Sequence, residues 1–188
     1  MSQVQHLPMT AEEYLAWEGR QELKWEFDGF QPVAMNGGTW AHARIQGNII
    51  WALKNRLRGK PCQPCGPDMR VPTMPGRYRY PDALVTGTPQ PLDGRDVTDP
   101  VVIFEVLSAS TAELDRTVKL SEYQSILSLR RYVMLEQTRL FATVITRTAN
   151  GWGIVLAGPE DVIAMPEVGV DLPVSDIYDG LTFPAAAP

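Results

Sequence analysis

Two apolar segments of this chain each carry a carboxylate, and this pairing constrains the fold more than any other feature. Asp82 follows Pro81 and opens the apolar run 83–85, and Glu105 ends the apolar run 101–104. Short apolar runs are typical of buried strands, where an uncompensated carboxylate is strongly unfavourable. Two carboxylates on neighbouring strands repel each other, and a hard divalent cation is the usual remedy. The alternative is that Glu105 ends its strand in solvent and that Pro81-Asp82 is a turn at a strand entry.

The remaining pattern alternates helices with strands. A capping box, Thr10 with Glu13, predicts a helix to about residue 19, and a second, Ser110 with Glu113, predicts one to about 126. Apolar residues at four-residue spacing predict a long helix over 40–58. We expect strands at 23–27, 30–35, 69–71, 81–86, 101–107, 132–136, 140–146 and 153–156, with a hairpin turn at Asp28-Gly29 and a short helix near 174–178. This order predicts an α/β (α+β) fold with a mixed β-sheet flanked by helices.

Length and composition indicate an ordinary globular protein. The chain has 188 residues, 44% hydrophobic and 21% charged, so one domain is expected, with a core at about 9–157 and an acidic C-terminal tail at 158–188. No apolar run approaches the ~18–20 residues that span a bilayer. The first nine residues lack the pattern of a signal peptide. We therefore expect a cytoplasmic location and no membrane partner.

The charges are unevenly distributed along the chain. The net charge is −5, yet Asp68 is the one acid between His42 and Tyr80, and no Lys or Arg follows Arg147. The bases in that middle stretch are Arg44, Lys54, Arg56, Arg58, Lys60, Arg70, Arg77 and Arg79. Such a stretch can present a positive face to phosphates despite the overall sign. The alternative is that these are ordinary solvated surface charges.

Lys119 lies on the predicted helix that follows Glu105. Asp115, Glu122 and Tyr123 share its helical face. Two acids and a lysine are the minimum set for metal-assisted cleavage of a phosphodiester, in which the ammonium orients water and offsets developing charge. The alternative is an exposed lysine that pairs with Asp115 or Glu122.

Three further features admit two interpretations each. Glu26, at the end of a predicted strand, is either a third acid near the metal or a solvent-facing residue. His42 lies in the first turn of the predicted long helix, where it either contacts phosphate or is an ordinary polar residue. Cys62 and Cys65 form a C-x-x-C without a second pair of ligands, so reduced, part-buried thiols are favoured over a zinc or redox site.

Several motifs together resemble a known family. They are Trp25–Gly29 (WEFDG), Ala41-His42, Arg79–Asp82 (RYPD), Phe104–Ser108 (FEVLS), Ser110-Thr111, Asp115, Lys119, Tyr123 and Arg131–Val133 (RYV). In this order, from about Met9 to Gln137, the chain resembles the Uma-two family, endonucleases of the PD-(D/E)XK or restriction-endonuclease-like superfamily. The resemblance implies a mixed sheet flanked by helices, Mg²⁺ dependence and phosphodiester hydrolysis.

The resemblance assigns roles to individual residues. Asp82 and Glu105 match the metal-binding acids and Glu26 the upstream acid, and the backbone carbonyl of Val106 is a further candidate metal ligand. The superfamily places its lysine two residues after the second acid, where this chain has Leu107. Lys119 would therefore supply the ammonium.

We expect a Mg²⁺-dependent DNA endonuclease, with Mn²⁺ as a substitute, that acts as a homodimer to cut both strands. The expected DNA-contacting residues are His42, Arg44, Arg56, Arg58, Arg77 and Arg79. The alternative is a catalytically inactive DNA-binding or protein-interaction domain on the same fold, because a site can decay on an intact scaffold.

Overall fold

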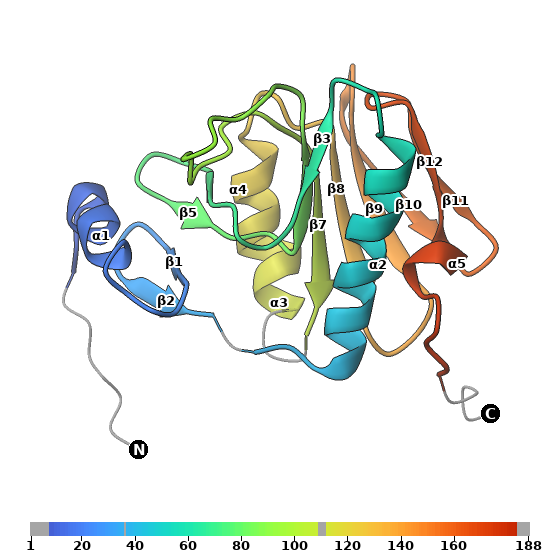
Figure 1. The fold of residues 1–188 in the computed structure, drawn as a ribbon, viewed down its shortest axis with the longest axis horizontal. Helices are drawn as coiled ribbons and strands as arrows, with labels where there is room; N and C mark the ends of the chain where they lie inside the picture. The colour runs from blue at the N-terminus through green and yellow to red at the C-terminus, as the bar shows by residue number, and fades with distance from the viewer. Residues whose placement is uncertain (1–7, 36, 109–111, 184–188) are drawn as a thin grey trace.

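A six-stranded mixed sheet forms the centre of the molecule. The computed structural model describes residues 8–35, 37–108 and 112–183 (Figure 1). The strand order is β10-β9-β8-β7-β6-β3, and only β7 and β8 are parallel neighbours. The strands are β3 (Gln63–Cys65), β6 (Ala83–Thr86), β7 (Pro100–Leu107), β8 (Arg131–Glu136), β9 (Ala142–Thr148) and β10 (Gly151–Ala157). This mixed sheet with flanking helices confirms the predicted fold class.

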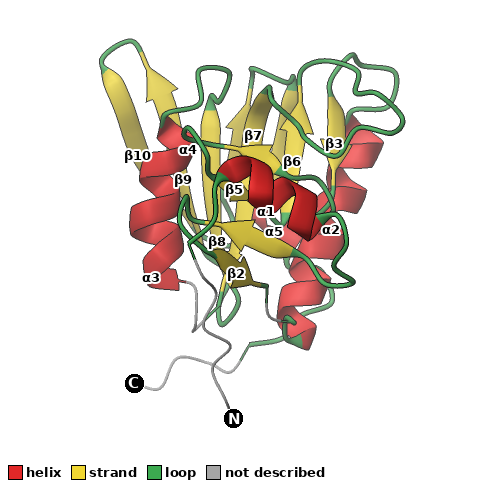
Figure 2. Cartoon of the chain, turned by 90° about the vertical axis from the view of Figure 1, so that its left-hand side faces the viewer, coloured by secondary structure: helices red, strands yellow, loops and turns green. Residues whose placement is uncertain are grey.

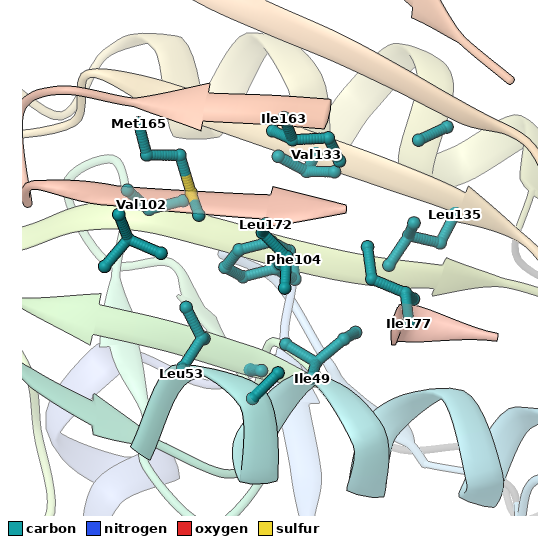
Figure 3. Packing of buried hydrophobic residues seen from close by; sticks show 14 of the residues in the cluster. Ile49, Leu53, Val102, Phe104, Val133, Leu135, Ile163, Met165, Leu172 and Ile177 are labelled. Atoms are coloured by element: carbon teal, nitrogen blue, oxygen red, sulfur yellow. The ribbon is translucent and has the colours of Figure 1, made fainter. Parts of the chain in front are cut away.

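Helices cover the two faces of this sheet (Figure 2). The long helix α2 (Trp40–Arg56) lies on one face, and the other carries α3 (Ala112–Leu114), a π-helical turn η1 (Asp115–Lys119) and α4 (Leu120–Gln124). Alternate residues of β7 explain the arrangement, because successive side chains of a strand point to opposite faces. Phe104 packs in the cluster that contains Ile49 of α2 (Figure 3). Ile103 packs instead in the cluster that contains Tyr123 of α4.

A smaller sheet, of order β2-β1-β5-β4, is formed mainly by the N-terminal part of the chain. Its strands are β1 (Trp25–Phe27), β2 (Pro32–Ala34), β4 (Val71–Pro72) and β5 (Tyr78–Arg79). Helix α1 (Ala11–Glu18) begins at the predicted capping box and packs Tyr14 on Phe27, with ring centroids 4.6 Å apart. The Asp28-Gly29 turn is confirmed: Gly29 has a φ of 90°, and β1 pairs with β2 antiparallel.

The second capping box falls on Ser110 and Thr111, which lie outside the described residues. The long helix expected after it is divided into α3, η1 and α4. In the described ranges, no helix combines the length and apolar character that a bilayer span requires.

The C-terminal segment is part of the core, which corrects the expectation of an acidic tail from residue 158. It forms a hairpin of β11 (Val162–Met165) and β12 (Val170–Pro173), followed by α5 (Val174–Ile177). Ile163, Leu172 and Ile177 are buried in the same cluster as Phe104 (Figure 3). Buried and exposed residues alternate along both strands, which is a strand pattern that the acidic composition of the segment conceals.

We predict that Leu172→Ala lowers the free energy of unfolding by about 2–5 kcal/mol, the usual range for truncating a buried leucine. Leu172 is 0% exposed. Urea denaturation measures the change, with Asp171→Ala as control because Asp171 is an exposed neighbour on the same strand. Equal midpoints for the two variants would show that the hairpin is not part of the cooperative core.

Candidate active site

A cavity of about 800 Å³ gathers the four predicted catalytic residues. Glu26, Asp82, Glu105 and Lys119 line it, and each is between 4 and 8% exposed. The first turn of α2 and the end of β7 also contribute to its walls, and both lie at the same lower end of the molecule in Figure 1. None of these four residues is therefore an ordinary solvent-facing surface charge.

Strand register explains why the two acids meet. Strands β6 and β7 are antiparallel, with Ala83 opposite Phe104. Continuing this register by one residue places Asp82 opposite Glu105, and directly opposed residues project from the same face of a sheet. This register is the physical reason that the two acids, expected from the sequence to be neighbours, lie side by side.

Lys119 stands among three carboxylates. Its Nζ atom lies 3.0 Å from Glu26 Oε1, 3.3 Å from Glu105 Oε1 and 3.2 Å from Asp115 Oδ1. Burial alone would lower the pKa of Lys119, but the carboxylates of Glu105, Glu26 and Asp115 outweigh burial and raise it. The lysine therefore remains an ammonium at neutral pH.

The Glu105 carboxyl, buried beside three other acids, holds a proton more readily than an ordinary glutamate does because its pKa is raised. Burial raises its pKa well above the ordinary value, Lys119 opposes the rise, and Asp82, Asp115 and Glu26 add to it. Tyr123 donates its hydroxyl to Glu105 Oε1 at 2.8 Å. One ammonium cannot neutralise three carboxylates, so protonation of Glu105 relieves the remaining repulsion.

Asp82 is held by a separate set of donors. The Val106 N–H donates to Oδ2 at 2.7 Å, and Gln46 Nε2 donates to Oδ1 at 2.9 Å. His42 Nε2 lies 3.3 Å from the same Oδ1, and its hydrogen bond to Asp82 raises the pKa of His42 against the effect of burial. These contacts fix the carboxylate toward the cavity, which Asp82, His42 and Val106 all line.

The protein's own donors reach both acids. Lys119 and Tyr123 contact Glu105, and Gln46 and the Val106 N–H donate to Asp82. The divalent cation expected from the sequence is therefore not the sole source of charge compensation at this pair.

The donor set nevertheless suits a hard cation. Five acids are buried around this site, Glu26, Asp82, Glu105, Asp115 and Glu122, against two buried bases, Lys119 and Arg79. Asp115 Oδ1 has an ion pair but no hydrogen bond within the described ranges. The Val106 N–H points to Asp82, and the carbonyl of a strand residue points to the same side of the strand as its N–H.

No group of three or more His, Cys, Asp or Glu residues surrounds a common metal position in the described part of the chain. Mg²⁺ binds through one or two protein carboxylates and keeps several waters. Asp82, Glu105 and the Val106 carbonyl therefore fit Mg²⁺ by ligand type and number.

Arg79 has a role that the sequence analysis missed. Its guanidinium is 1% exposed and binds Glu122 through two hydrogen bonds of 2.7 Å and Glu26 through one of 3.1 Å. It orients Glu26 toward Lys119 from behind the cavity. A buried, paired guanidinium is not available to a phosphate, so Arg79 is removed from the expected DNA-contacting set. The sequence before Pro81-Asp82 alternates Arg with Tyr and gave no sign of this burial.

The other expected DNA-contacting residues differ in their availability. Arg44 donates to the Asp179 carbonyl, Arg56 pairs with Asp176 at 2.5 Å and Arg77 pairs with Glu122 at 2.8 Å. Arg58 is exposed and has no ion pair with another described residue. Much of the basic middle stretch is therefore engaged with the protein's own acceptors.

The two cysteines lie on opposite faces of the large sheet. Cys62 packs against the cluster that contains Ile49, and Cys65 packs against the cluster that contains Tyr123. Both are free, and burial raises the pKa of the Cys65 thiol. This placement favours the expected structural thiols over a shared zinc or redox site.

Comparisons with known proteins agree with this geometry. The family model Uma2, described as "Putative restriction endonuclease", matches residues 11–175. Two proteins of Synechocystis sp. (strain ATCC 27184 / PCC 6803 / Kazusa) are similar to the chain. "Uncharacterized protein slr1290" is 30% identical over 178 residues, covering 93% of this chain and 94% of its own. "Uncharacterized protein sll1609" is 31% identical over 133 residues, covering 69% and 75%.

A crystal structure shares the fold. It is that of "a putative nuclease belonging to DUF820 from Anabaena variabilis ATCC 29413", with a TM-score of 0.74 at 15% identity, covering 91% of this chain and 98% of the other. The family model spans most of the chain and agrees with the motif resemblance noted above. The protein therefore belongs to the Uma2 family, whose description is "Putative restriction endonuclease", and this membership supports a nuclease-type function.

Proposed function

We propose that this protein is a Mg²⁺-dependent DNA endonuclease. The observation that carries the proposal is the single cavity in which Asp82, Glu105, Glu26 and Lys119 converge. Asp82, Glu105 and the Val106 carbonyl would hold the cation. When bound, Mg²⁺ or Mn²⁺ supplies Lewis-acid polarisation of the phosphoryl oxygen and a more acidic water.

The surrounding side chains have distinct parts in this proposal. Lys119 places a permanent positive charge beside Glu105, where it offsets the negative charge that develops on the phosphate. Glu26 and Asp115 keep that ammonium protonated and in position. Tyr123 orients Glu105, and Gln46 orients Asp82, so both carboxylates are fixed before substrate binds.

Cleavage of supercoiled plasmid and of labelled oligonucleotides tests the proposal. We expect cutting with Mg²⁺ or Mn²⁺ and none in EDTA. Absence of cutting by the wild-type protein with either metal, over duplex, single-stranded and branched substrates, would favour the catalytically inactive alternative. One observation supports that alternative, since the Lys119 ammonium already compensates Glu26 and Glu105 without a metal.

The proposal includes a homodimer related by a two-fold axis, because cutting both strands of a duplex takes two active sites. Light scattering measures the oligomeric state in the absence and presence of DNA. A dimer is expected to convert supercoiled plasmid into linear product. A persistent monomer that only nicks plasmid would contradict the dimer and leave the nuclease assignment intact.

A further inference from the structure

The solvent-facing side of α2 carries two highly exposed tryptophans. Trp40 is 76% exposed and Trp51 is 68% exposed. They are eleven residues apart, just over three helical turns, so both rings project from the same side of the helix. Neither indole has a ring contact or hydrogen bond with another described residue. Ala43 and Gly47 lie between the two tryptophans on this side of the helix, and their small size leaves space between the two rings.

The same side of α2 is basic. Lys54 is exposed and follows Trp51 by three residues, and Arg58 is exposed just beyond the end of the helix. Neither base forms an ion pair within the described ranges. No Asp or Glu occurs anywhere from Trp40 to Arg58, in a chain whose net charge is −5. Trp40, Trp51, Lys54 and Arg58 form what we call the α2 strip, a surface complementary to a polyanion.

The α2 strip is continuous with the candidate active site. Thr39, Ala41 and His42 line the cavity, and Trp40 lies between the first two in sequence. From the cavity rim the helix extends for about 25 Å at 1.5 Å per residue. Figure 1 shows α2 running from the end that holds the C-terminus of β7 toward the opposite end of the sheet. A ligand bound along the strip would therefore end at the catalytic carboxylates.

Aromatic rings spaced along a basic surface suit one class of polyanion. The bases of a single strand stack on aromatic side chains while nearby Lys and Arg contact its phosphates. In a duplex the base faces are covered by neighbouring base pairs and cannot stack on Trp40 or Trp51. The site acids also lie at most 8% exposed inside the cavity, where one extended strand fits more readily than a duplex.

We propose that the α2 strip binds single-stranded DNA and directs it into the cavity, so that the substrate is a single strand, a flap or an unpaired loop. The assignment of this strand as substrate rests on the proposed nuclease function, whereas its binding to the strip does not. The two are separable because binding is measured in EDTA, where no metal-dependent cleavage occurs.

Fluorescence anisotropy with a labelled oligo-dT in EDTA tests the strip. Trp51→Ala is expected to raise the Kd by about 5- to 150-fold, the range for losing one stacked base, and Trp51→Phe by less. Lys54→Gln combined with Arg58→Gln is expected to reduce the slope of log K against log salt by roughly 1.4, or about 0.7 for each lost charge on a single strand. Leu127→Ala, which removes an 85% exposed apolar side chain after α4, is the matched control and should change neither quantity.

Three outcomes would overturn the proposal. The first is that Trp51→Ala binds oligo-dT as tightly as Leu127→Ala does, and the second is that Trp51→Ala loses as much affinity for duplex DNA as for oligo-dT. The third is that Trp51→Ala converts a dimer to a monomer without any change in DNA binding. The last outcome would identify the strip as a contact between copies of the chain. If the wild type binds oligo-dT through Trp51 but never cuts, the nuclease proposal fails and the strip stands. If the wild type cuts DNA and Trp51→Ala does not change oligo-dT binding, only the proposed role of the α2 strip fails.

Discussion

Glu105→Gln is expected to reduce DNA cleavage by roughly 100-fold or more while leaving the protein folded. The amide is a poorer metal ligand than the carboxylate, and the bound cation supplies several kcal/mol of transition-state stabilisation, each 1.36 kcal/mol being a factor of ten. The substitution is nearly isosteric and keeps an acceptor for the Tyr123 hydroxyl. Single-turnover cleavage at saturating Mg²⁺ measures the loss, and Glu160→Gln, at an exposed site, is the control.

The same variant is expected to alter the pH dependence of stability in metal-free buffer. Because burial raises the pKa of Glu105, the folded state binds its proton more tightly than the unfolded state does. The resulting stabilisation is complete below the ordinary value of 4.5 and is lost as pH rises through the raised pKa. Gln cannot titrate, so the wild type should lose stability relative to Glu105→Gln as the pH is raised.

Thermal unfolding of both proteins in EDTA, from about pH 5 to 9, measures this difference. Saturating Mg²⁺ should stabilise the wild type and not the variant, because only the carboxylate form of Glu105 is a strong metal ligand. Parallel pH curves together with equal Mg²⁺ responses would remove Glu105 from the metal site.

The sequence predicted the parts of the site that depend on local pattern. Asp82 and Glu105 came from apolar runs that end in an acid, and the strand register explains why they meet. The shared helical face of Asp115, Lys119, Glu122 and Tyr123 was also predicted, and all four residues are buried. Local periodicity is sufficient for these features because both strands and the helix pack on the same core.

The sequence did not predict features that depend on contacts between distant segments. Arg79 is 43 residues from Glu122 and 53 residues from Glu26 in the sequence. Local sequence pattern therefore predicted Arg79 to be an exposed base in a basic stretch. The hairpin after residue 158 was missed for a similar reason. Its buried residues, such as Leu172, alternate with exposed ones and become core only where α2 and β7 pack against them.

Replacing Arg79 with Met is expected to lower the free energy of unfolding by about 3–5 kcal/mol, the usual effect of breaking a buried ion pair by removing one partner. The change leaves Glu122, itself 1% exposed, without its two strongest hydrogen bonds. Urea denaturation at neutral pH measures the loss. Arg77→Met is the control, because Arg77 binds the same Glu122 but its side chain is 37% exposed, so its loss should cost no more than about 1 kcal/mol.

The dependence of the free energy of unfolding on pH, below neutral pH, distinguishes stabilisation by this ion pair from stabilisation by side-chain packing. Burial would raise the pKa of Glu122, but hydrogen bonds from Arg79 and Arg77 outweigh burial and lower it. The pair therefore stabilises the protein above the ordinary value of 4.5, and this contribution is lost as pH falls through the lowered pKa. In Arg79→Met the Glu122 carboxylate keeps only Arg77 and Thr73 as partners among the described residues and takes up a proton more readily, so the penalty should shrink on acidification.

Arg79→Met combined with Glu122→Gln should then cost less than the sum of the single changes, because the double variant leaves no buried carboxylate at position 122 without its main partner. Strict additivity, or a penalty that does not vary with pH, would mean that Arg79 stabilises the protein through the packing of its side chain alone.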